Sequence, residues 1–144
     1  MSCAPAGDDP DANVEYYVSL LDSGKQLAYN GNVEVYKPVK FLKPPPGDGE
    51  ILLRVTRKRW ESNWWLIPIK VDSEVQSLHI GADSQLFMGD AVLEKFEAVI
   101  LLFDPNSQRI FSMMNPNQSL VIGASGEAKM MENGDSKYSL DAAK

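Results

Sequence analysis

One stretch of the chain constrains its fold more than any other. The run "FEAVILLF" (residues 96–103) is followed by "DPNS" (104–107) and then by "QRIFSMM" (108–114). Asp followed by Pro is typical of the start of a type I turn, because the fixed φ of proline suits the second turn position. The apolar part, "AVILLF", is far shorter than the ~20 residues that a membrane-spanning helix needs. The stretch therefore predicts an antiparallel β-hairpin.

Other short runs are separated by turn signals in the same way. "QLAYNGNVEVYKPVKFL" reads as strand, turn and strand, with Asn30-Gly31 marking a tight turn. The prolines of "KPPPGDGE" cannot donate ladder hydrogen bonds, so a loop is expected there. "VEYYVSLLDSG" fits either a short helix or a strand. Further strand-like runs are "ILLRVTR", "WWLIPIKV", "EVQSLHIG", "SQLFMG" and "SLVIGA". The pattern predicts an all-β fold, an antiparallel β-sandwich or barrel of seven to nine short strands.

The chain divides into one folded region and two polar ends. Its 144 residues are about the usual size of one domain. We expect residues 1–13, which are small and acidic, to form a flexible leader, and residues 127–144 to form a flexible C-terminal tail. Residues 14–126 are then a single β domain.

The charge of the chain is uneven. The formal net charge is −6, yet residues 51–70 hold five bases and one acid. A negative protein repels a polyanion over most of its surface, so no nucleic acid is expected as a partner. The N-terminus is acidic and has no apolar stretch of the kind found in secretory signals, and one cysteine cannot form an internal disulfide. These features predict a cytoplasmic location.

The residue types that usually carry catalysis are scarce. His79 is the only histidine and is expected at the rim of a sheet, and Cys3 is the only cysteine and lies in the leader. Neither a catalytic triad nor a zinc site can be assembled from them. We therefore predict that the protein is not an enzyme and binds no cofactor or metal. The acidic clusters are better explained as solvated turns or strand ends: Asp8, Asp9 and Asp11; Asp48 and Glu50; Glu94 and Glu97.

The stretch "RVTRKRWESNWWLI" (residues 54–67) is the most plausible contact surface. It is interpreted as two strands joined by the basic turn "KRWESN". Successive strand residues face opposite ways, so one of two adjacent tryptophans must face outward. We expect Trp65 to be buried and Trp64 to face away, covered by a tail or available for binding. The candidate contact with acidic lipid head groups or an acidic protein consists of Arg57, Lys58, Arg59 and Trp64.

The order of these motifs resembles a known family. "AYNGNVEVYKPVKFL", "ILLRVTRKRWESNWWLI", "LHIGADSQLFMG" and "FEAVILLFDPNSQRIF" are similar to segments of the small kinetoplastid calpain-related proteins, also called small myristoylated proteins. Those proteins are single copies of the N-terminal domain of kinetoplastid calpain-like proteins. The resemblance implies an antiparallel all-β module without the calpain Cys-His-Asn machinery, located at the plasma membrane, flagellum or subpellicular cytoskeleton.

The resemblance also concerns the N-terminus. Family members begin Met-Gly-Cys, with a myristoylated glycine and often a palmitoylated cysteine, whereas this chain begins Met-Ser-Cys. Without glycine at position 2 there is no myristoylation substrate, so Cys3 alone remains as an acylation site. One lipid chain gives only marginal membrane binding.

These observations predict a non-catalytic binding or scaffold module at the membrane or cytoskeleton periphery of a kinetoplastid cell. Its partners would be membrane lipids, or cytoskeletal or calpain-like proteins. One alternative is a regulator or inhibitor of a cysteine protease, since the loop "LKPPPGDGE" is long enough to enter a cleft. Another is an extracellular lipoprotein anchored by lipid on Cys3. Nothing in the pattern indicates an oligomeric state.

Overall fold

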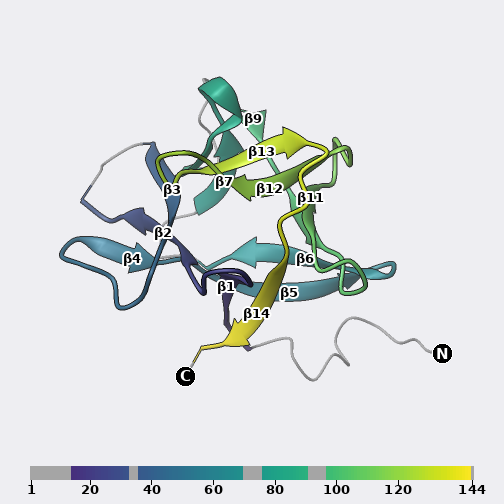
Figure 1. Cartoon of the computed structure of the whole chain (residues 1–144), viewed down its shortest axis with the longest axis horizontal. Coiled ribbons are helices and arrows are strands. Elements are labelled where there is room, and N and C mark those ends of the chain that lie inside the picture. The colour runs from purple at the N-terminus through teal and green to yellow at the C-terminus, as the bar shows by residue number, and fades with distance from the viewer. Residues whose placement is uncertain (1–13, 33–35, 70–75, 91–96, 144) are drawn as a thin grey trace.

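The computed structural model describes residues 14–32, 36–69, 76–90 and 97–143 (Figure 1). In these ranges the regular structure is β-strand apart from one 3₁₀ turn, η2 (Ala82–Ser84). The strands are β1 (Tyr16–Leu20), β2 (Gln26–Asn30), β3 (Lys37–Leu42), β4 (Glu50–Leu52), β5 (Arg54–Trp60), β6 (Asn63–Pro68), β7 (Gln76–Ile80), β8 (Leu86–Asp90), β9 (Glu97–Ala98), β10 (Leu101–Phe103), β11 (Ile110–Ser112), β12 (Gln118–Ile122), β13 (Ala128–Glu132) and β14 (Tyr138–Ala142). The predicted leader, residues 1–13, lies outside the described ranges.

The strands form one continuous antiparallel sheet that curls on itself. Its order is β13-β12-β11-β10-β6-β5-β1-β2-β3-β8-β7-β9, with β14 paired to β1 and β4 paired to β2. Figure 1 shows β12 and β13 across the molecule from β5 and β6. The turn before β13 returns to β3, where the Phe41 N–H donates to the Gly126 carbonyl at 2.8 Å. The predicted all-β antiparallel class is confirmed, and its form is a curled half-barrel.

The hydrophobic core fills the inside of the curl. Strands far apart in the sequence supply it, for example Leu27 from β2, Met88 from β8 and Leu120 from β12. Tyr138 of β14 is fully buried among them; its ring stacks on Phe41 with 6.0 Å between ring centroids. Its hydroxyl donates a 2.7 Å hydrogen bond to the Leu120 carbonyl. Burial raises the pKa of Tyr138 above its ordinary value, so the hydroxyl stays protonated.

The predicted C-terminal tail is wrong. Residues 127–144 contain β13, which pairs with β12 along its whole length, and β14, which pairs with β1 from Tyr16 opposite Ala142 to Leu20 opposite Tyr138. The segment looks like a tail because its composition is polar. β13 forms a local hairpin with β12, and β14 is ordered by pairing with β1, which is distant in sequence and which local composition does not reveal. The folded region therefore extends past residue 126.

The number of strands was also underestimated. The described residues contain fourteen strands, against seven to nine predicted. Two strands lie in the supposed tail, and single residues divide longer runs, as Leu53 divides β4 from β5. The strand runs 26–42 pair as predicted, but Tyr29 lies opposite Val39, so the connection is wider than a tight turn at Asn30-Gly31.

The hairpin that the sequence marks most clearly is confirmed. Leu101 to Phe103 of β10 pair with Ile110 to Ser112 of β11. Asp104 organises the turn, since its carboxylate accepts hydrogen bonds from the Asn106 N–H at 2.9 Å and the Ser107 hydroxyl at 3.0 Å. This hairpin joins the β5–β6 side of the sheet to the β12–β13 side.

Candidate functional site

The β5–β6 hairpin carries the basic residues that the sequence singles out. The strands pair along their full length, so residues 61–62 alone form the turn. Glu61 has a φ of 56°, the left-handed conformation typical of tight hairpin turns. The longer basic turn expected from "KRWESN" is therefore wrong. Arg57, Lys58 and Arg59 lie within β5 itself.

The alternation of β5 divides these residues between two faces. Arg59 lies opposite Trp64, and Arg57 points to the same side two positions earlier. That side faces the core, against which Trp64 packs. Lys58 lies opposite Trp65 on the outer side. The structure thus brings together three of the four predicted contact residues and places Lys58 on the other face.

The two adjacent tryptophans have the reverse of their predicted orientations. Trp64 shares the inner side with Leu66, which is buried, and packs against the core. Trp65 points outward beside Leu102 of β10 and is partly covered there. Trp64 and Trp65 are both large and apolar, so the hydrophobic pattern alone does not show which of them faces the core. The pairing of β6 with β10 decides it.

Trp64 is the centre of a stack of cationic and aromatic side chains. The guanidinium carbon of Arg57 lies 4.1 Å from the Trp64 ring centroid and 4.7 Å from that of Tyr16. The guanidinium carbon of Arg59 lies 4.5 Å from the Trp64 ring centroid. All three distances fall within the ~6 Å over which an aromatic face attracts a cation. The sequence did not identify Tyr16 as part of this site, because Tyr16 belongs to β1, whose pairing with β5 is long-range.

The basic residues of β5 differ in how their charges are neutralised. Arg54 forms an ion pair with Glu15, with 2.8 Å between Nη1 and Oε1. Lys58 and Arg59 are exposed, and neither has a carboxylate partner within the ranges that the structure describes. The hairpin end therefore keeps a local positive charge on a protein whose formal net charge is −6.

An exposed aromatic side chain completes the hairpin end. Trp60, the last residue of β5, leaves 43% of its surface accessible and points to the same side as Lys58. A tryptophan with one wet side suits a boundary between water and an apolar phase. In the sequence Trp60 stands beside the basic residues and was expected in the turn, whereas the structure places it in β5.

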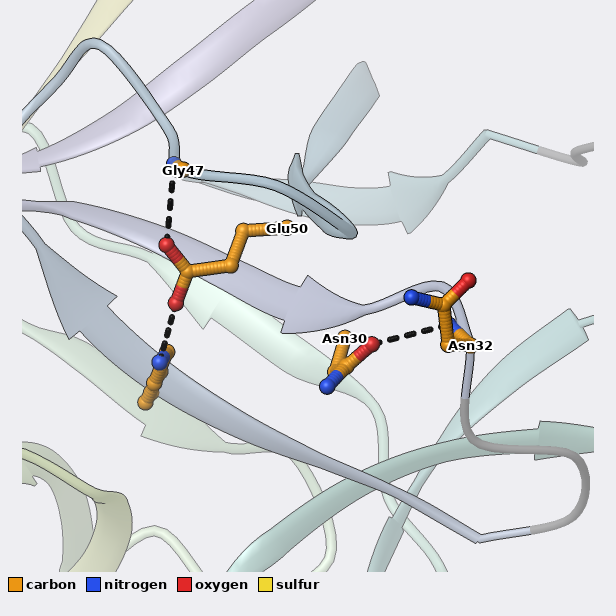
Figure 2. A network of polar contacts seen from close by, with 5 residues as sticks. Asn30, Asn32, Gly47 and Glu50 are labelled. Atoms are coloured by element: carbon orange, nitrogen blue, oxygen red, sulfur yellow. Dashed lines mark hydrogen bonds and ion pairs between the residues drawn. The ribbon is translucent and has the colours of Figure 1, made fainter.

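The proline-containing loop forms a second prominent feature. Residues 43–48 are all exposed. Glu50 anchors the loop, since its carboxylate accepts the Gly47 N–H at 2.9 Å and forms an ion pair with Lys40 (Figure 2). The same two contacts, that with Lys40 being the larger, lower the pKa of Glu50. Nearby, the Asn32 N–H donates to the Asn30 side-chain oxygen at 2.8 Å.

His79 lies inside the sheet rather than at its rim. It belongs to β7, opposite Phe87 of β8 and Ala98 of β9, and only 1% of its surface is accessible. Its Nε2 lies 3.4 Å from the Ser77 hydroxyl, and its Nδ1 has no hydrogen-bond partner among the described residues. Burial lowers the pKa of His79, so its neutral form is favoured.

The remaining candidates form no site within the described residues. Cys3, the cluster Asp8, Asp9 and Asp11, and Glu94 lie outside those ranges. Glu97 is exposed at the start of β9, and Glu50 is engaged in its loop. No group of three or more His, Cys, Asp or Glu side chains in the described ranges is arranged to hold a metal ion.

Comparisons with known proteins identify no relative. Neither the family models nor the curated proteins nor the solved structures contain a match to this chain. Among the described residues, no helix has the length and apolar character required to cross a membrane.

Proposed function

We propose that the protein is a non-catalytic binding module that attaches to an anionic membrane surface through the end of its β5–β6 hairpin. The observation that carries this proposal is the exposed pair Lys58 and Arg59, which have no carboxylate partner within the described ranges, beside the exposed Trp60. Basic residues near an anionic bilayer each contribute about 1 kcal/mol of attraction. Tryptophan adds affinity for the head-group region.

The acidity of the rest of the protein supports a surface contact of limited extent. A net charge of −6 disfavours a broad approach to an anionic bilayer, so the hairpin end would approach first. Arg57 and Arg59 stack on Trp64, which itself packs against the core. This packing holds the exposed Arg59 guanidinium group in place, so less side-chain freedom is lost on binding.

The proposed biological setting follows the family resemblance. We place the protein with the small kinetoplastid calpain-related proteins, as a scaffold at the cytoplasmic side of the plasma membrane, the flagellum or the subpellicular cytoskeleton. Its all-β fold is compatible with that assignment. Acylation of Cys3 would add a second attachment to the membrane, because one weak signal gives reversible binding and two give stable anchoring.

Vesicle co-sedimentation tests the proposal. The full chain is mixed with neutral phosphatidylcholine vesicles and with vesicles that also contain phosphatidylserine. We expect binding to the anionic vesicles alone, weaker in high salt, and lost in the double variant K58E/R59E. Equal failure to bind both kinds of vesicle would contradict membrane attachment and would leave an acidic protein as the partner of the hairpin.

The anchored loop favours a second candidate, inhibition of a cysteine protease. Residues 43–48 protrude, and the contacts of Glu50 with Gly47 and Lys40 hold the loop in one shape. A preformed loop enters a cleft at a lower entropic cost than a mobile one. Inhibition assays against papain-like and calpain-like proteases test this candidate, with Glu50→Gln expected to weaken inhibition. Unchanged protease activity at high protein concentration would rule it out.

A further inference from the structure

We propose that the outer face of strands β5, β6, β10 and β11 lies against the anionic membrane, so that the hairpin end is one edge of a larger contact. This inference rests on the proposed function and deepens it, because it names the surface that follows the hairpin end onto the bilayer. The side chains that define this surface are those of the four strands that point away from the core.

The strand register places one row of side chains across this face. Lys58 of β5 lies opposite Trp65 of β6. Trp65 lies in turn opposite Leu102 of β10, and Leu102 lies opposite Phe111 of β11. None of these residues belongs to the core cluster, whereas Leu101, the neighbour of Leu102 in β10, does. Adjacent strands lie about 4.8 Å apart, so the row runs for about 14 Å across the outer face.

The middle of the row is apolar. Leu102 points outward, yet only 3% of its surface is accessible. Its neighbours in the row, Trp65 and Phe111, are half-buried, and aromatic side chains at cross-strand distance are large enough to cover it. Ile67, two positions along β6 from Trp65, points to the same side and is also half-buried. The outer face therefore presents partly exposed apolar surface from Trp65, Ile67 and Phe111.

The four strands carry no acidic residue, although the formal net charge of the protein is −6. The acidic strand residues in the described ranges belong to β4, β8, β9, β13 and β14. The turns of the two hairpins contain Glu61 and Asp104, and the Asp104 carboxylate already accepts hydrogen bonds from Asn106 and Ser107. An anionic bilayer thus meets no acidic strand residue on this face, and the exposed Lys58 attracts it.

The kinds of side chain on this face favour a membrane as its partner. Trp60 points to the same side as Lys58 and Trp65, so two of the three tryptophans lie on the outer face. Tryptophan prefers the boundary between head groups and acyl chains, because its ring is apolar and its N–H is polar. Lysine lays its apolar stem along such a boundary and keeps its charge among the head groups. The face is also continuous with the hairpin end.

The first experiment uses two adjacent tryptophans on opposite faces as each other's control. The full chain is labelled with fluorotryptophan, so that Trp60, Trp64 and Trp65 each give a fluorine NMR signal. It is then bound to bicelles that contain phosphatidylserine and a lipid with a spin-labelled head group. We expect the signals of Trp60 and Trp65 to broaden strongly and that of Trp64, on the inner side, to broaden least. Equal broadening of Trp64 and Trp65 would overturn the contact of the outer face.

Two variants with the same change of net charge test the face by affinity. Phe111→Glu removes an aromatic ring from the row and adds a negative charge, and it should weaken adsorption to phosphatidylserine vesicles about tenfold. Met131→Glu is the matched control. Met131 leaves 49% of its surface accessible and belongs to β13, which lies across the molecule from β5 and β6 (Figure 1). Adsorption of this variant should stay within about twofold, because the new charge lies more than a Debye length from the bilayer.

The results separate this inference from the proposed function. Circular dichroism checks that both variants fold, and the fluorine experiment needs no substitution on the face. Suppose that the unchanged chain binds phosphatidylserine vesicles, that K58E/R59E does not, and that Phe111→Glu and Met131→Glu bind alike. The hairpin end is then the attachment, and the contact of the outer face is refuted. Failure of the unchanged chain to bind any vesicle would refute both proposals.

Discussion

The β5–β6 hairpin and the C-terminal strands β13 and β14 each differ from what their compositions suggest about exposure and burial. The hairpin holds all three tryptophans of the chain, yet its end is exposed and positively charged. The C-terminal strands come from a polar segment, yet they supply Met130 and the fully buried Tyr138 to the core. Amino-acid content alone thus misassigns both regions. Stability and binding should depend on different strands, and mutations should separate them.

Tyr138→Ala should have the largest effect. Removing a fully buried aromatic ring leaves a cavity and should lower the free energy of unfolding by about 3–5 kcal/mol. Urea denaturation followed by circular dichroism measures the change. Vesicle binding by the fraction that remains folded should be unaffected, because Tyr138 lies in β14 and not in the hairpin. A stability change below about 1 kcal/mol would show that β14 does not complete the core in solution.

Tyr138→Phe is the matched control for that variant. It keeps the ring that stacks on Phe41 and removes only the hydroxyl that donates to the Leu120 carbonyl. The buried carbonyl then lacks this donor, which should cost about 1–3 kcal/mol. A loss equal to that of Tyr138→Ala would mean that the hydrogen bond, and not the packing of the ring, dominates.

The double variant K58Q/R59Q should produce the opposite result. Removing two exposed charges should weaken adsorption to phosphatidylserine vesicles by about 2 kcal/mol, roughly 30-fold. The free energy of unfolding should change by about 1 kcal/mol or less, because neither residue has a carboxylate partner within the described ranges and Arg59 loses only an exposed cation–π contact with Trp64. Co-sedimentation at low salt measures the first quantity and urea denaturation the second. Destabilisation comparable to that of Tyr138→Ala would contradict the separation of roles.

Replacing Glu61 should strengthen membrane binding rather than weaken it. It is the one acidic side chain at the tip of the hairpin, next to Trp60, and it opposes approach to an anionic surface. Glu61→Asn removes the charge and keeps a residue that tolerates the φ of 56°. Adsorption to anionic vesicles should strengthen by about 1 kcal/mol, and binding to neutral vesicles should not change. Tighter binding to both would indicate an effect of turn conformation instead of charge.

The effect of His79 on the free energy of unfolding should be smallest at neutral pH and should appear only on acidification. Burial lowers its pKa in the folded state below the ordinary value of about 6.5. The unfolded chain therefore binds the proton more readily, and stability falls as the pH drops below about 6.5. The lowered carboxylate pKa values of Glu50 and Glu127 act at more acidic pH and do not obscure this window.

Urea denaturation at several pH values between about 7.5 and 5.5 measures this dependence. His79→Phe should abolish most of the slope, since a ring of similar shape replaces a group whose Nδ1 has no hydrogen-bond partner among the described residues. An identical slope in this variant would assign the pH dependence to another group. Vesicle binding should keep its dependence on Lys58 and Arg59 across the same range.

Local sequence pattern correctly predicted most of the elements whose contacts are local, although it missed the β12–β13 hairpin. The hairpin at Asp104, the pairing of β5 with β6 and the strands around His79 all follow from apolar runs that end at turn residues. The strand pairs that distant residues form were not predictable in this way. Tyr16 meets Val55 on one edge of β1 and Ala142 on the other. No local signal marks either contact.

The candidate site shows the same limit at the level of side chains. The sequence identified Arg57, Lys58, Arg59 and Trp64 as a group, but it did not show on which face each would lie. An inward-pointing arginine normally contradicts a strand assignment, because a buried charge is costly. Here the rings of Tyr16 and Trp64 give Arg57 favourable contacts at the edge of the core. These contacts depend on β1, so they can be identified only once the tertiary fold is known.

The pairing of β14 with β1 has a consequence for the synthesis of the protein. β14, the strand that closes over Tyr16, is synthesised long after β1, and Tyr138 arrives with it. Middle hairpins such as β5–β6 are able to form before β14 has been synthesised, whereas the complete core has to wait until β14 has left the ribosome. A nascent or prematurely terminated product without β14 would expose the part of the core that Tyr138 covers in the folded protein. Such products should be recognised by chaperones and proteases far more readily than the full-length protein.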